Sequence, residues 1–263
     1  MSARDQKLHY AWVVAASIFV VLLCAAAVRA TPSVLIVPLE REFGWSRALI
    51  SSAVSLNLVL YGLVGPFAAA IMQSFGIRRT VLASLFVIAC GVGLTTFIAA
   101  PWQLILFWGV LVGLGTGTTA MVLGATVVQR WFATQRGLVM GLLTASTATG
   151  QLLFLPLMAA WVEHRGWRSV SVLIASIVAA LIPLVALLVR DRPSDLGLKP
   201  YGAAIDAPDP VEPTTRPLAN AIGALARASQ HRDFGCSPAR SSSAARRRAV
   251  WSAAPAPAHS APV

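Results

Sequence analysis

The chain has 263 residues, of which 57% are hydrophobic and only 12% are charged. Soluble domains have about 45–50% apolar and about 25% charged residues, so the composition excludes both an ordinary soluble protein and a disordered one. The formal net charge is +11. In a membrane protein, such an excess is typical of Arg and Lys kept in cytoplasmic loops.

Six long apolar runs follow one another along the chain, and each can cross about 30 Å of hydrocarbon as a helix. Their predicted bounds are 12–39, 48–72, 80–100, 102–128, 137–162 and 169–189. We therefore predict an all-α membrane protein whose six-helix transmembrane bundle occupies residues 12–190. The first run is too long for a signal peptide and lacks a convincing cleavage site, so we expect it to be retained.

Polar segments flank the predicted bundle. Residues 1–11 form a short N-terminal segment, and 191–234 are predicted to be a linker because Pro, Asp and Thr are frequent in 203–217. In the last segment, 235–263, Ala, Pro, Ser and Arg make up 23 of the 29 residues. This low-complexity composition predicts a disordered tail, since it offers too little apolar surface to fold alone.

Arg and Lys are distributed unequally between the two sides of the predicted bundle. With the N-terminus in the cytoplasm, nine fall inside: Arg4, Lys7, Arg78, Arg79, Arg130, Arg136, Arg190, Arg192 and Lys199. Four fall outside: Arg41, Arg47, Arg165 and Arg168. This bias predicts a multi-pass protein of the cell's inner membrane with both termini in the cytoplasm.

Arg29 is the most informative single residue because it lies well inside the first apolar run. A charge at that depth costs at least about 2.5–3.5 kcal/mol and is tolerated where it faces the bundle interior or a water-filled cavity. One interpretation is therefore an anion-binding guanidinium in a transport pathway. The other is an arginine that extends towards the membrane surface or pairs with a backbone carbonyl.

Three polar residues in other apolar runs are candidates for the same cavity. Asn57 and Tyr61 lie four positions apart and thus share one face of a helix, and Gln151 lies in the fifth run. These side chains would contact a substrate beside Arg29, or they would only form hydrogen bonds between helices, worth about 0.6 kcal/mol each. The sequence leaves both interpretations open.

The sequence gives little support for a metal, cofactor, nucleotide or nucleic-acid site. The four histidines and three cysteines are scattered, which predicts neither a metal site nor a cofactor. The glycines of the fourth run form no nucleotide loop, because they lie inside an apolar helix, where small residues serve close packing. The basic run 246–248 lacks interleaved aromatic residues, so we expect no nucleic-acid partner.

The loop between the second and third runs contains an ordered set of glycines and arginines: Gly65-Pro66 is followed by Gln73-Ser74-Phe75-Gly76-Ile77-Arg78-Arg79. This pattern resembles the cytoplasmic gate loop of the major facilitator superfamily. The Gly and Arg positions match the family pattern, whereas Gln73 replaces the usual acid and Ser74 the usual first Arg. Because Gln73 is neutral, it cannot form the ion pair that the acid makes at the family's gate.

Further motifs resemble the bacterial branch near the monocarboxylate and oxalate/formate transporters. They are Glu42-Phe43-Gly44-Trp45-Ser46-Arg47, Arg130-Trp131-Phe132, Gly166-Trp167-Arg168 and the stretch 190–202. The resemblance covers roughly residues 8–202 and implies the N-terminal six-helix half of a secondary transporter for a small organic anion. It implies a site between two halves, with Arg29 as the counter-charge.

Only one six-helix half is encoded in these residues, which leaves alternatives open. The composition after Phe234 favours a frameshift or a premature truncation that removes the second half. A homodimer could instead enclose a cavity. A different class of function is a membrane scaffold or inactive fragment without transport; an integral membrane enzyme would need a His/Asp/Glu cluster that the sequence lacks.

Overall fold

The computed structural model describes residues 9–203. The predicted tail 235–263, the linker from residue 204 onwards and residues 1–8 lie outside the described residues. Within 9–203 the structure is helical, and its β-type pairing is a single bridge between Phe132 and Tyr201.

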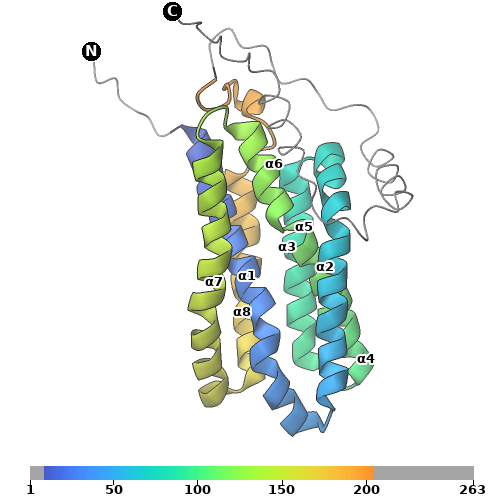
Figure 1. The fold of residues 1–263 in the computed structure, drawn as a ribbon. Helices are drawn as coiled ribbons and strands as arrows, with labels where there is room; N and C mark the ends of the chain where they lie inside the picture. The colour runs from blue at the N-terminus through green and yellow to red at the C-terminus, as the bar shows by residue number, and fades with distance from the viewer. Residues whose placement is uncertain (1–8, 204–263) are drawn as a thin grey trace, which may run out of the picture. The chain divides into compact units, whose positions relative to one another are not determined.

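The chain runs up and down through successive long helices (Figure 1). Their bounds are α1 (Tyr10–Phe43), α2 (Arg47–Phe75), α3 (Ile77–Leu94) with the 3₁₀ turn η1 (Thr95–Phe97), α4 (Pro101–Leu104), η2 (Ile105–Val112), α5 (Gly113–Thr118), α6 (Met121–Trp131), α7 (Arg136–Arg165), α8 (Trp167–Leu188) and the 3₁₀ turn η3 (Pro193–Leu196). Six helical stretches in the described part are long and apolar enough to cross a membrane. The predicted six-helix all-α membrane fold is thus confirmed.

The fourth span differs from the single helix predicted over 102–128. It begins as α4, widens to a π-helix in η2, continues as α5, and is interrupted at Thr119 and Ala120 before α6 starts. Ala120 is extended, with ψ at −168°. The interruption follows a stretch rich in Gly and Thr, whose low helix propensities weaken the helix locally.

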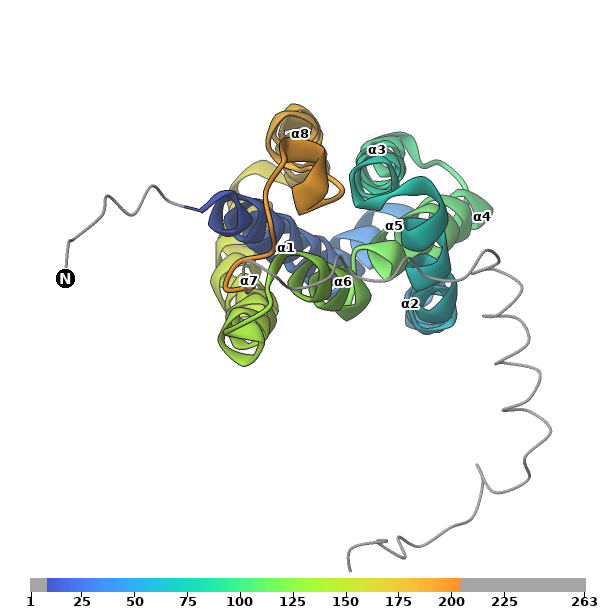
Figure 2. The same cartoon turned by 90° about the horizontal axis from the view of Figure 1, so that it is seen from above.

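The first three spans pack against the last three. α1 packs mainly against α7 and α2 mainly against the η2 and α5 part of the fourth span, whereas α3 packs against α8 and also against η2 and α5. Figure 2 looks along the helices from one end of this arrangement. Exchanging the first three spans with the last three leaves the pairing unchanged, as expected for two three-helix repeats packed into one bundle.

The contact between α1 and α7 is close because both helices have small residues there. A Cβ on Gly150 of α7 would lie 2.6 Å from the carbonyl oxygen of Leu23 and 3.0 Å from the Cβ of Ala26, both on α1. Within a membrane, helices associate largely through such close packing of backbones, since lipid chains are as apolar as leucine. Gly150 therefore sets the distance between α1 and α7.

We predict that Gly150→Ala lowers the thermal stability of the purified protein in detergent. The added methyl group must push α1 away from α7, at a cost of about 1–3 kcal/mol. Gly141→Ala on the same helix is the matched control, because nothing lies within 4 Å of a Cβ there. Equal melting temperatures for the two variants would contradict this account of the contact.

Candidate functional site

Arg29 lies near the middle of α1 and contacts α2 through Tyr61. Its Nη1 donates a hydrogen bond to the Tyr61 hydroxyl at 3.1 Å, and its guanidinium carbon lies 4.2 Å from the centre of the Tyr61 ring. Arg29 is half-buried. Among residues 9–203, no carboxylate forms an ion pair with Arg29. Within the described part of the chain, the contacts of its guanidinium are thus with the hydroxyl and the ring face of Tyr61.

Asn57 connects α2 to the fourth span. Its buried Nδ2 donates to the backbone carbonyl of Trp108 at 2.9 Å, within the π-helical stretch η2. The glycines of α5 allow this close approach: a Cβ on Gly113 would lie 3.1 Å from the Asn57 Cα, and one on Gly117 would lie 3.2 Å from the Tyr61 Cα. Asn57 thus forms the interhelical hydrogen bond that was one of its two predicted interpretations.

A small cavity of about 60 Å³ brings three of the predicted residues together. Arg29, Asn57 and Gln151 line it, with Val28, Pro32, Val54, Leu58, Trp108 and Val112. Tyr61 does not line the cavity; it accepts a hydrogen bond from Arg29, which does. The cavity has room for a few water molecules or for one small carboxylate group, and its polar wall comes from α1, α2 and α7.

Trp108 is one of the lining residues that sequence reasoning missed, and it contacts a predicted residue, Asn57. Within an apolar run, a tryptophan is indistinguishable from an ordinary core residue. Its contribution comes from its backbone carbonyl and from the wider helix at η2, and neither has a signature in the residue types. No local sequence signal could have identified Trp108 as a neighbour of Arg29.

The predicted gate loop lies at the other polar region of the described chain, at the end of the bundle where α1 begins. Gly76 ends α2 and precedes α3 with φ at +89°, a conformation that favours glycine. The Asp191 carboxylate, which follows α8, accepts a hydrogen bond from the backbone N–H of Arg78 at 2.8 Å. A Cβ on Gly76 would lie 2.6 Å from this carboxylate, so both the backbone conformation and the space require glycine.

The remaining residues of the predicted gate loop are placed differently. Gln73 and Arg79 are exposed on the same side as Gly76. The Arg78 side chain donates from Nη2 to the Ala186 carbonyl at 2.6 Å and so ties α3 to α8. Gly65 lies ten residues before the end of α2, where nothing is within 4 Å of a Cβ, and it does not take part in the loop.

The gate loop borders an open hollow of about 580 Å³. Its lining comes from the end of α2, the start of α3, the end of α6 and the segment after α8, and comprises Gln73, Ser74, Phe75, Gly76, Arg78, Arg79, Leu82, Arg130, Asp191, Arg192 and Asp195. The hollow thus contains an acid, Asp191, beside the loop in which Gln73 replaces the family's usual acid. Asp191 belongs to the segment after α8, more than a hundred residues after Gln73 in the sequence.

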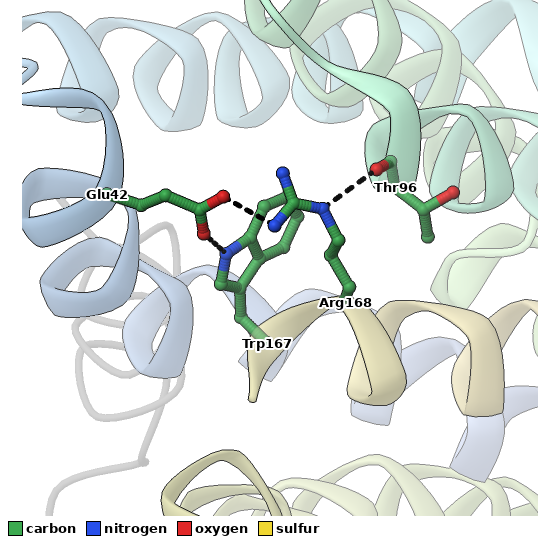
Figure 3. Close-up of polar contacts among 4 residues, drawn as sticks. All are labelled: Glu42, Thr96, Trp167 and Arg168. Carbon is green, nitrogen blue, oxygen red and sulfur yellow. Dashed lines mark hydrogen bonds and ion pairs between the residues drawn. The ribbon is translucent and has the colours of Figure 1, made fainter. Parts of the chain in front are cut away.

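At the opposite end of the bundle, four residues form a polar cluster (Figure 3). Glu42 at the end of α1 accepts hydrogen bonds from Trp167 Nε1 and Arg168 Nη1, each at 2.5 Å. Arg168 also donates to the Thr96 carbonyl at 3.3 Å, and its guanidinium lies over the Trp167 ring. These contacts connect the end of α1 with η1, which follows α3, and with the start of α8.

Comparison with known proteins identifies the family. The sequence profile of the Major Facilitator Superfamily matches residues 18–254, which is most of the chain. The chain belongs to the major facilitator superfamily. The resemblance predicted from the gate loop and the flanking motifs is thereby confirmed.

Curated members of the superfamily are similar over the same part of the chain. An uncharacterised MFS-type transporter, YcxA of Bacillus subtilis, is 27% identical over 188 residues, which are 69% of this chain and 45% of that protein. Human monocarboxylate transporter 14 is 29% identical over 191 residues, which are 73% of this chain and 37% of that protein. The chain therefore spans less than half the length of these relatives.

Solved structures of the superfamily show the same fold. The proton:xylose symporter XylE bound to 6-bromo-6-deoxy-D-glucose superposes with a TM-score of 0.60 at 16% identity, covering 70% of this chain and 46% of that one. The inward-open form of XylE from E. coli gives the same TM-score at 15% identity. Six helices of this chain thus correspond to about half of a complete superfamily structure.

We predict that Asp191→Ala destabilises this superfamily bundle by about 1 kcal/mol. The variant leaves the first turn of α3 without its acceptor and without a negative charge beside the positive end of the helix. Asp191→Asn should cost less, because it removes the charge but keeps an acceptor oxygen. Glu163→Ala, an exposed acid on α7, is the control. Chemical denaturation measured by circular dichroism tests the order Glu163→Ala, Asp191→Asn, Asp191→Ala.

Proposed function

We propose that the chain forms one half of a secondary transporter that moves a small organic anion of the monocarboxylate type across the membrane. The observation that carries this proposal is the Arg29 guanidinium, which borders a cavity inside the bundle and has no carboxylate partner among residues 9–203. An intramembrane charge in such a place is by default a functional group. The names of several relatives as monocarboxylate transporters support the same substrate class.

The proposed chemistry of binding follows from the donors around the cavity. A guanidinium presents a planar fork of N–H groups that matches the two oxygens of a carboxylate. Arg29 already donates one N–H to Tyr61, which orients the fork and leaves the others for a ligand. Gln151 and Asn57 add amide groups from α7 and α2, which would contact the rest of a small polar anion.

For transport, the binding site must also be enclosed from the side opposite the Arg29 cavity. Transporters of this fold bind substrate near the membrane midplane between two six-helix halves, which rock to expose the site to each side in turn. We propose that the Arg29 cavity forms one wall of that site. A C-terminal half or a second copy of this chain, as a homodimer, would supply the other.

Uptake of a radiolabelled monocarboxylate into lipid vesicles that contain the purified chain tests whether the protein as it exists transports. Uptake above that of empty vesicles, retained when the protein is cross-linked as a dimer, supports the homodimer. Substrate binding without uptake supports a separate second half. Absence of both supports the scaffold or inactive-fragment alternative.

We predict that Arg29→Ala weakens monocarboxylate binding by about 10- to 100-fold, the loss expected for a charge-assisted hydrogen bond. Pyruvate is a suitable probe, and fluorescence is a suitable readout because Trp108 lines the cavity. Arg29→Lys should also bind weakly, because a point charge does not reproduce the bidentate fork.

Arg41→Ala is the matched control for this experiment, since Arg41 is an exposed arginine on the same helix. Its affinity for pyruvate should equal that of the unsubstituted chain. The proposal fails if Arg29→Ala binds pyruvate as tightly as Arg41→Ala does.

We further propose that the chain lies in the inner membrane with both ends of the bundle in the cytoplasm, as the Arg and Lys bias suggests. Single cysteines introduced at Gln103 and His164, in a background lacking the native cysteines, should then react with an impermeant thiol reagent added to intact cells. Cysteines at Ser74 and Thr134 should react only after lysis. The reverse pattern would overturn this orientation.

A further inference from the structure

The hollow beside the gate loop has the composition of an anion site. Four arginines line it, Arg78, Arg79, Arg130 and Arg192, against the two acids Asp191 and Asp195. At about 580 Å³, it falls within the range of small-molecule pockets, about 300–1,000 Å³. It lies at the ends of α2, α3 and α6, where spanning helices leave the membrane.

The two acids in the hollow are already engaged by backbone groups. Asp191 accepts from the backbone N–H of Arg78 at 2.8 Å, and Asp195 accepts from the backbone N–H of Arg192 at 3.1 Å. Within residues 9–203, neither forms an ion pair with Arg78, Arg79 or Arg130. These hydrogen bonds hold the backbone at Arg78 and Arg192. With four arginines and two acids, the lining has an excess of two positive charges.

Arg78 and Arg130 use only some of their side-chain donors on backbone carbonyls. Arg130 uses Nη2 on the Met72 carbonyl at 3.3 Å, and Arg78 uses Nη2 on the Ala186 carbonyl. The Nε of Arg78 is buried and has no hydrogen-bond partner in the part of the chain that the structure describes. A buried, unpaired charged donor is costly, so an oxygen-rich anion would relieve an unfavourable state as well as gain contacts.

We propose that this hollow binds a phosphate group. Arginine forks match phosphate oxygens bidentately, and clusters of arginines are typical of phosphate recognition. A phosphate here has two sources, the headgroup of an anionic phospholipid and a free phosphate in solution. Basic pockets between spanning helices at the membrane surface favour lipid headgroups, and Phe75 and Leu82 add apolar surface to the lining. This proposal does not depend on the transported substrate.

Equilibrium binding to the purified full chain in uncharged detergent tests the site. The probes are short-chain phosphatidylglycerol, short-chain phosphatidylcholine and inorganic phosphate. Phosphatidylglycerol should bind at least about 10-fold more tightly than phosphatidylcholine, because only the former carries a net negative charge. Competition by millimolar inorganic phosphate identifies free phosphate as the source, and its failure to compete identifies the lipid headgroup.

Arg79→Gln is the cleanest variant, because Arg79 is exposed and makes no hydrogen bond or ion pair with the rest of residues 9–203. It should weaken phosphate binding by about 5-fold or more, and the double variant with Arg130→Gln should weaken it further. Arg165→Gln, at the opposite end of the bundle, removes the same charge and should bind normally. Circular dichroism confirms that each variant is folded. Unchanged affinity in Arg79→Gln and in the double variant, or no binding of any probe to the unsubstituted chain, overturns the proposal.

Discussion

The bundle depends on how closely α1 and α7 approach each other. Inside a membrane, apolar side chains gain little by leaving lipid for protein, so helix pairs are held by dispersion and by backbones that meet without intervening side chains. At Gly150 the separation is fixed by the Leu23 carbonyl. This contact places α7, and with it Gln151, directly beside the helix that carries Arg29. Without a side chain at position 150, α7 lies close enough to α1 for Gln151 to line the same cavity as Arg29.

The polar groups of the cavity are held by three different means. Arg29 is oriented by a tyrosine on α2, Asn57 by a backbone carbonyl of the fourth span, and Gln151 by the position of its helix alone. Asn57 and Arg29 therefore have fixed positions, whereas Gln151 is exposed and keeps its amide for other contacts. A ligand in this cavity would meet a rigid wall on the side of α1 and α2 and an adaptable one on the side of α7.

Hydropathy alone predicted the six spans, because each run of apolar residues exceeds the thickness of the hydrocarbon. It also singled out Arg29, since a charge in such a run is exceptional. The convergence of Asn57 and Gln151 on Arg29 remained one alternative among others, because helix rotation depends on contacts between distant segments. Asp191 was missed for the same reason: its role at Gly76 exists only once residues after α8 return to the start of α3. The interruption of the fourth span was also missed, although its Gly and Thr residues were visible.

That interruption divides the fourth span into two helical segments, which are connected by the non-helical residues Thr119 and Ala120. Hydroxyl groups add to the backbone hydrogen bonds there: Thr118 donates to the Gly115 carbonyl at 2.7 Å, and Thr119 donates to the Gly115 and Thr116 carbonyls, each at 3.3 Å. The Gly115 carbonyl also accepts from the backbone N–H of Thr119. Because these carbonyls stay satisfied by side chains, a change of angle between α5 and α6 need not expose a bare carbonyl to hydrocarbon. α5 packs against α2 and α3, whereas α6 packs against α7, α2 and α1. A change of angle at Thr119 and Ala120 would therefore alter how α6 lies between α7, α2 and α1 without breaking a hydrogen bond inside any other span.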